Sequence, residues 1–361
     1  MSRSFFFPER HLAGQAGFSL VELLVAMGIG MLGMLAIMQA FSVTEKYKEN
    51  TTGTSSAQTN GSIALFSIER DIRMAGYGIT NPTALGCGPV QYYYNTNYTS
   101  PPGGTLAALR VAPVMITQGA GSAPDIITTF ASSASYRFAP ATLTVAMASA
   151  NAAISVDAVT AFAPGDLVMA VNSGTCAIMQ VTNVLSSSLE HTNSGAAPFN
   201  PPTGSTLPAF AAGSQLFNLG RPQIRTYAVA GNDLMVADWL LTLAGTPSTV
   251  IVDEIVDLQA EYGLDDGSGG GVPNDGRVDG YTTTTPASAA GWQQVLAIRF
   301  AVLSRGPFEK PDAAGTCTAT TAAPTWAGGT LNLPTTPQAG CYRYRVFETT
   351  VPIRNMIWRD S

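Results

Sequence analysis

Charged residues are scarce in this chain. Only 12% of the 361 residues are Asp, Glu, Lys or Arg, and the formal net charge is -6. A protein that binds a phosphate backbone needs clustered Lys and Arg, which this composition does not supply. Nucleic-acid binding is therefore disfavoured, whereas the abundance of Gly, Pro, Ser and Thr favours an exported, β-rich protein.

Histidine is rarer still, and this scarcity argues against a catalytic function. The chain has two histidines, and only His191 follows the apolar segment 18–41. It stands alone in a Ser, Thr and Asn-rich stretch, where we expect an exposed side chain. No P-loop is present, and the glycine run 267–271 is predicted to be a flexible loop. A Ser, His and Asp site would rest on one histidine, so we predict a protein that is not an enzyme.

Cysteine is limited to four residues, none in a CxxC pair or beside a histidine, which excludes the usual zinc spacings. An even number in an exported chain favours disulfides, for which three connectivities exist. The preferred pairs are Cys317 with Cys341 and Cys87 with Cys176. Free buried thiols are the alternative for each pair.

In contrast to these scarce residue types, the chain has one long apolar segment at residues 18–41, with the sequence FSLVELLVAMGIGMLGMLAIMQAF. At about 1.5 Å per residue it is long enough to cross a hydrocarbon core of about 30 Å. It exceeds the apolar core of an ordinary cleaved signal. Arg3 and Arg10 precede the span, whereas Lys and Glu are balanced after it, so we expect a cytoplasmic N-terminus and an exported remainder.

A carboxylate interrupts this span. Placing the charged Glu22 side chain inside a membrane costs on the order of 3 kcal/mol. This carboxylate therefore needs a partner that neutralises it. Cleavage after Gly17 would free an ammonium on Phe18, four residues earlier on the same helical face. In a bundle of such helices, Glu22 of one subunit would instead neutralise the new amine of a neighbour.

These residues carry a family resemblance. The segment GFSLVELLVAM, residues 17–27, resembles the class III signal of type IV prepilins and pseudopilins. The resemblance implies peptidase cleavage after Gly17, N-methylation of Phe18 and an assembly role for Glu22. A plain single-pass anchor is the alternative.

Past the span, Ile63, Phe66, Ile68, Ile72 and Met74 form an approximate helical stripe that we expect to lie on a sheet. Gly76, Gly78 and Pro82 then end the helix. The stretch 51–61, TTGTSSAQTNG, is a poor helix former and predicts a bend or loosened turn.

The rest of the chain alternates short apolar runs with Gly, Pro, Asn and Ser, which predicts antiparallel sheet. The expected strands are 126–130, 143–147, 167–171, 178–184, 224–229, 234–239, 250–256, 295–303 and 344–351. We interpret 84–105, 186–213 and 306–340 as inserted loops. The predicted fold class is α+β, with a long N-terminal membrane-spanning helix followed by a β-rich antiparallel globular domain.

Scattered distal segments are similar to the PilW family of minor pilins. They are RDIRMAGYG at 70–78, GDLVMA at 165–170, VDLQ and YGLD between 256 and 265, Trp292 with Val295 and Arg299, and VPIRN at 351–355. The resemblance implies a pilin-like organisation with a leader at 1–17, a membrane and filament-core helix at 18–41, its amphipathic continuation at 42–78, and a globular domain at 79–361.

One acidic, glycine-rich stretch at 264–280 is a candidate calcium site, because acidic residues separated by glycines can wrap around Ca²⁺. Its candidate ligands are Asp265, Asp266, Asp275 and Asp279. Gly271 and Pro273 stand where earlier acidic ligands are expected, so a solvated acidic hairpin loop is the alternative.

An aromatic cluster at Tyr92, Tyr93, Tyr94 and Tyr98 offers a second candidate surface. Aromatic faces bind sugars or partner proteins, and more often they cover the edge of their own core. An adhesive or sugar-binding module predicts an exposed platform at these tyrosines.

The resemblance implies a minor pilin that primes type IV pilus assembly and supports a tip complex. Its implied partners are other minor and major pilins, prepilin peptidase, the inner-membrane assembly platform and a tip adhesin. The implied location is the inner membrane, with the C-terminal domain in the periplasm, and then the pilus. Pseudopilins of type II secretion or DNA uptake share the leader and are the alternatives.

Overall fold

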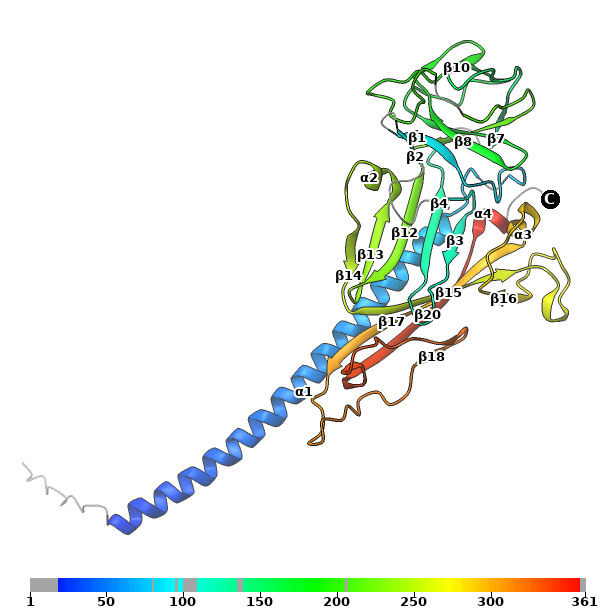
Figure 1. Ribbon diagram of the computed structural model, residues 1–361. Helices are drawn as coiled ribbons and strands as arrows, with labels where there is room; N and C mark the ends of the chain where they lie inside the picture. Colours follow the sequence, from blue (N-terminus) through cyan, green and yellow to red (C-terminus); the bar gives the residue numbers. More distant parts are fainter. Residues whose placement is uncertain are drawn as a thin grey trace, which may run out of the picture. The chain divides into compact units, whose positions relative to one another are not determined.

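The computed structural model describes residues 19–79, 81–94, 97–99, 109–134, 139–204 and 207–357. The chain divides into two compact units, Met1–Gly53 and Thr54–Ser361. In the described residues of the first unit the chain is almost entirely helical. The second unit combines the remainder of that helix with several antiparallel sheets (Figure 1), so the α+β architecture predicted from the sequence is confirmed.

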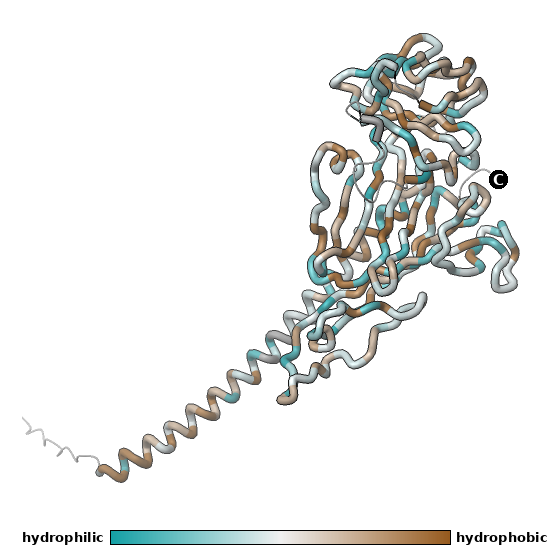
Figure 2. The backbone as a smooth tube through the Cα atoms, viewed as in Figure 1, coloured by the Kyte–Doolittle hydropathy of each residue, from teal (hydrophilic) through white to brown (hydrophobic). Residues whose placement is uncertain are grey.

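Helix α1 spans Leu20–Met74. It ends where predicted, because Gly76 adopts a left-handed φ of 84° that other residues rarely adopt. Its first part is mostly brown, the colour of hydrophobic residues, in Figure 2. The stretch Leu20–Glu45 is long and apolar enough to cross a membrane, and none of its most apolar window is buried by the chain itself.

The loosened turn predicted at 51–61 is wrong, because these residues are helical throughout. Hydroxyl groups donate to carbonyls one turn earlier, as Thr59 Oγ1 does to Ser55 O at 3.0 Å. The small residues also serve packing. A Cβ built on Gly61 would lie 2.1 Å from the Phe347 ring, so glycine lets the helix approach β20 (Tyr342–Pro352) closely.

The predicted apolar stripe of the helix is in fact two faces. Ile68 and Ile72 are fully buried against the sheets, as predicted. Ile63, Phe66 and Met74 lie on the opposite side, with 45%, 65% and 44% of their surface exposed. Because residues 63 and 66 are offset by about half a turn from 68 and 72, one helix cannot place both sets against one sheet.

Two sheets pack with this helix and form the region that we call the helix-backed sheets. One has the order β14-β13-β12-β4-β3, and the other has the order β16-β15-β17-β20. The strands not yet bounded are β3 (Val114–Thr117), β4 (Ile126–Ala131), β12 (Gln223–Ala230), β13 (Asp233–Asp238), β14 (Thr249–Val252), β15 (Ile255–Leu264), β16 (Gly280–Thr282) and β17 (Val295–Phe308). One core joins Ala64, Ile68 and Ile72 of α1 to both sheets.

Three short α-helices and a β-hairpin adjoin this region. They are α2 (Trp239–Leu243), α3 (Ala289–Gln293), α4 (Arg354–Ile357) and the pair β18 (Thr325–Trp326) and β19 (Gly329–Thr330). Helix α2 ends the predicted strand 234–239 early, because the Asp238 carboxylate accepts hydrogen bonds from Leu240 N and Leu241 N and caps the helix.

The remaining strands form a second β region, which we call the charge-poor lobe and define as β1, β2 and residues 139–220. Its main sheet has the order β2-β1-β8-β7-β11-β5, and a small sheet has the order β6-β10-β9. The bounds are β1 (Gln91–Tyr94), β2 (Asn97–Thr99), β5 (Ala141–Thr142), β6 (Ile154–Ser155), β7 (Leu167–Asn172), β8 (Thr175–Gln180), β9 (Asn183–Val184), β10 (Ser188–Glu190) and β11 (Gln215–Gly220). Figure 1 shows these strands gathered beyond the ends of β12 and β4.

Three of the predicted strands, and the predicted loops, differ from the strands in the structure. The predicted strand 178–184 is divided between β8 and β9, and 250–256 is divided between β14 and β15 at Glu254, whose φ is 58°. The predicted strand 143–147 contributes only isolated bridges from Leu143 and Met147. The stretches expected as loops contain the short strands β1, β2, β10, β18 and β19.

Candidate functional site

The N-terminus of α1 is the first candidate site. Gly17 and Phe18 lie outside the described residues. Ser19 precedes the helix, and its Oγ accepts a hydrogen bond from Glu22 N at 3.2 Å. Glu22 therefore lies in the first turn of α1, where the positive end of the helix dipole favours a carboxylate.

A buried ion-pair cluster fixes the other end of this helix to β12. The Asp71 side chain is 4% exposed and accepts from Arg225 Nη1 at 2.9 Å and from Tyr227 OH at 2.7 Å. Burial, followed by the hydrogen bond with Asp71, raises the pKa of Tyr227. In the sequence, Asp71 is indicated only by the similarity of residues 70–78 to a family segment. The structure shows why a carboxylate is needed at this position.

Two further carboxylates are buried in the helix-backed sheets. Asp125 accepts from Gly119 N at 2.8 Å and Ala260 N at 2.9 Å. Asp257 accepts from Leu258 N, from Gln259 Nε2 and from Asn332 N at 2.6 Å. Burial raises the pKa of both carboxyls, and their bonds to N–H groups act in the opposite direction. They hold loops and strands in place.

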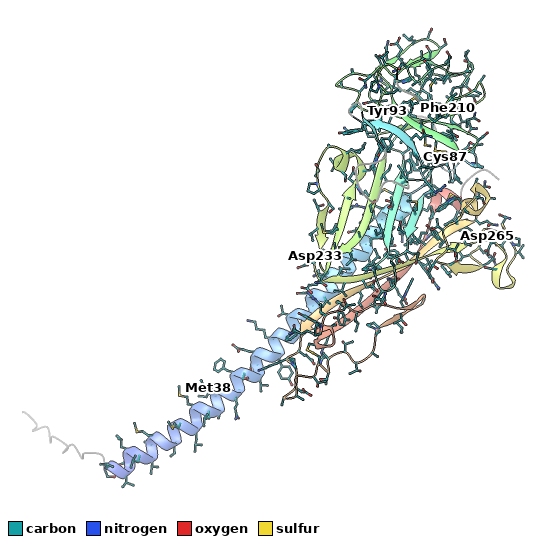
Figure 3. All side chains as sticks on the ribbon, in the orientation of Figure 1. Met38, Cys87, Tyr93, Phe210, Asp233 and Asp265 are labelled. Carbon is teal, nitrogen blue, oxygen red and sulfur yellow. A yellow bond between two sulfur atoms is a disulfide. The ribbon has the colours of Figure 1, made fainter. Side chains whose placement is uncertain are left out.

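The candidate calcium residues are held by backbone groups rather than aimed at one point. Asp265, labelled in Figure 3, accepts from Asp275 N at 3.2 Å and Gly276 N at 2.7 Å. Asp279 accepts from Gly267 N, and Asp266 accepts from Ser268 N. Over the described part of the chain, no group of three or more His, Cys, Asp or Glu side chains is arranged to hold a metal ion. Calcium binding stays a prediction.

The tyrosine cluster is a core feature rather than an exposed platform. Tyr92 and Tyr93 are 1% and 5% exposed, and Tyr92 packs edge-on against Trp239 with ring centroids 5.2 Å apart. Tyr94 is half-buried beside Phe199. The side chain of Tyr98 lies outside the described residues. The exposed platform that an adhesive module requires is therefore wrong for Tyr92 and Tyr93, because their rings complete a core at the end of the charge-poor lobe.

His191 is also buried, at 2% exposure, so the expectation of a surface histidine is wrong. Its Nε2 donates to Ala152 O at 2.8 Å, and its Nδ1 has no hydrogen-bond partner among the described residues. Burial lowers the pKa of His191. The hydrogen-bond partner Ala152 lies 39 residues earlier in the chain, so the polar sequence neighbours of His191 do not determine its exposure.

Both preferred cysteine pairs are present as disulfides. Cys87 bonds to Cys176, and Cys317 bonds to Cys341. The first disulfide joins the segment after α1 to β8 and lies in a core shared by the charge-poor lobe and the helix-backed sheets. The second closes a loop beside β20.

Comparison with known families gives two matches. Residues 224–355 match the family described as Type IV Pilus-assembly protein W, and residues 12–38 match the prokaryotic N-terminal methylation motif. No curated protein and no solved structure gives a match. The first match covers β12 to β20, and the second contains Gly17, Phe18 and Glu22. Residues 139–220 of the charge-poor lobe lie outside both.

Proposed function

This chain is a type IV prepilin-like protein with a C-terminal region of PilW type, and we propose that it acts as a minor pilin that primes pilus assembly and supports the tip complex. The observation that carries the proposal is the match of residues 12–38 to the methylation motif, which includes the first part of a helix whose apolar stretch Leu20–Glu45 its own chain leaves uncovered. Such a helix needs either lipid or other helices around it.

In this proposal the peptidase cuts after Gly17, and Phe18 becomes the methylated N-terminus. Glu22 then pairs with the terminal amine of a neighbouring subunit, which sets the register of the helices. The location of Glu22 in the first turn supports this role, because it keeps the carboxylate close to the new terminus.

The outward face of α1 supports contact with a further subunit. Phe66 is 65% exposed on the side opposite the sheets, with Ile63 and Met74 on the same face. Grouped exposed apolar side chains mark surfaces for association. This face therefore extends the subunit contacts of the apolar helix into the globular part of the molecule.

The first experiment measures the intact mass of the N-terminal peptide from membranes, with and without active prepilin peptidase. We expect a Phe18 start with one added methyl group, which is lost without the peptidase and in Gly17→Ala. An uncut Met1 start in peptidase-competent cells would refute processing and return the chain to the plain membrane anchors.

The second experiment tests assembly. Glu22→Ala is expected to be processed and stable but to lower the number of surface pili and the co-isolation of other pilins, whereas Glu45→Ala is the matched control. Phe66→Ser should also lower co-isolation while changing the free energy of unfolding by less than about 0.5 kcal/mol. Loss of protein secretion or of DNA uptake with normal pili would favour the pseudopilin alternatives.

A further inference from the structure

Four strands of the charge-poor lobe each have one terminus, the first or the last residue, at the same edge of its main sheet. Leu167 at the start of β7 pairs with Gln180 at the end of β8 and with Gly220 at the end of β11. Strand β1 runs parallel to β8, so Tyr94 at its end reaches the same edge. The residues at or next to these strand ends, Tyr94, Asp166, Gln180 and Arg221, come together although they are far apart in the sequence.

An open groove of about 550 Å³ lies at this edge, lined also by residues of α2 and of the loop that carries Phe199. This volume is within the usual range of small-molecule sites. One wall is aromatic and fixed in place. Tyr94 packs against Phe199 with ring centroids 5.3 Å apart, and Phe199 packs against Trp239 at 5.5 Å. Leu240 of α2 adds an aliphatic surface.

The polar groups of the groove have unused bonding capacity. Arg221 is exposed, and its guanidinium forms no ion pair with any carboxylate in the described part of the chain. Asp166 accepts from Ala163 N and Asn218 Nδ2 through Oδ2 alone. Gln180 Oε1 is buried and has no donor within the described residues.

We propose that this groove binds an acidic sugar, with the ring on the aromatic wall and the carboxylate on Arg221. The C–H face of a pyranose matches the apolar surface of Tyr94, and a guanidinium binds a carboxylate through two parallel hydrogen bonds. Asp166 Oδ1 accepts from ring hydroxyls. Between residues 141 and 220 the only Asp, Glu, Lys or Arg residues are Asp157, Asp166 and Glu190, and among the residues that line the groove Arg221 is the one cation.

The test uses the full-length chain in detergent and isothermal titration with a galacturonate trisaccharide. Maltotriose, which is neutral, is the matched ligand. We expect saturable binding of the acidic sugar only. Arg221→Gln, an exposed substitution that leaves the core intact, should weaken binding by at least about tenfold. Arg277→Gln, an exposed arginine on the acidic loop, is the matched control and should change binding less than about twofold.

Tyr94→Ala should also weaken binding at least about tenfold, and Tyr94→Phe, which keeps the ring, should retain it. Circular dichroism checks that each variant is folded. Equal binding of maltotriose, absence of saturable heat, or unchanged binding in Arg221→Gln would each overturn the proposal. So would binding of peptides through a C-terminal carboxylate in preference to the sugar. None of these outcomes depends on processing at Gly17, so this site can fail while the pilin proposal stands.

Discussion

The helix-backed sheets and the charge-poor lobe are both β structures of one chain, but different polar groups stabilise their interiors. Five buried charged residues, Asp71, Asp125, Asp257, Glu261 and Asp265, all belong to the helix-backed region. The buried polar residues of the lobe are neutral: His191, Asn200, Ser214 and Asn218. Asn200, for example, accepts from Gln180 N and donates to both Gln180 O and Thr192 O.

The difference follows from the kinds of structure and polar groups that the buried side chains of each region hold in place. Carboxylates fix a helix and loops that offer N–H and guanidinium donors, at the cost of burying charge. Amides satisfy donors and acceptors of a strand-rich lobe without that cost. The lobe then needs another connection to the rest of the chain, and the disulfide between Cys87 and Cys176 supplies it.

The largest expected effect is the loss of that disulfide. It joins residues 89 apart, and replacing both Cys87 and Cys176 with Ser should lower the free energy of unfolding by about 2–5 kcal/mol. We expect the charge-poor lobe to unfold first, giving two transitions in urea. The matched variant replaces Cys317 and Cys341, whose shorter loop of 24 residues should give a smaller loss and one transition. An equal loss for both pairs would contradict the special role of the first disulfide.

A smaller effect is expected in the helix-backed sheets. Asp71→Ala leaves Arg225 and Tyr227 without their shared acceptor and should cost about 2–3 kcal/mol, below the value for a fully buried pair because the Arg225 side chain is 30% exposed. Asp233→Ala, a more exposed aspartate on β13, is the control and should cost less than about 0.5 kcal/mol. Equal midpoints for the two variants in urea denaturation would show that Asp71 does not fix the helix.

The two regions also differed in how well the sequence predicted them. The first part of the long helix follows from its apolar run, and β4, β7, β12, β17 and β20 follow from short apolar runs parted by Gly, Pro, Asn and Ser. The buried state of His191 does not, because its sequence neighbours are polar and its hydrogen-bond partner Ala152 is distant in the sequence. The edge that gathers Tyr94 and Arg221 depends on the parallel pairing of β1 with β8, which local sequence does not encode.

The two faces of α1 near residues 61–74 look like one helical stripe in the sequence. The spacing of Ile63 and Phe66 suits a helix as well as that of Ile68 and Ile72, and periodicity does not reveal which face meets the sheet. Gly61 carries that information. Its missing Cβ marks the side on which Phe347 approaches, and it lies on the face of Ile68 and Ile72.

The smallest effect, and the one that separates the regions most directly, is the response to pH. Burial lowers the pKa of His191, so the folded lobe prefers the neutral imidazole. Its contribution to stability is complete above the ordinary pKa of 6.5 and is lost as the pH falls below that value towards the folded pKa. Asp125 and Asp257 have the opposite sign: their raised pKa values mean that the cost of burying the charged form disappears as the pH falls towards 3.8.

Between about pH 7 and pH 5 we therefore expect faster amide hydrogen exchange in β7, β8 and β10, after correction for the intrinsic rate, and unchanged or slower exchange in β15 and β17. His191→Gln retains a donor for Ala152 O but does not titrate, so it should remove the acceleration in the lobe and leave the helix-backed sheets unaffected. Acceleration of both regions together, or its persistence in His191→Gln, would show that acid acts on the whole domain rather than through this one buried imidazole.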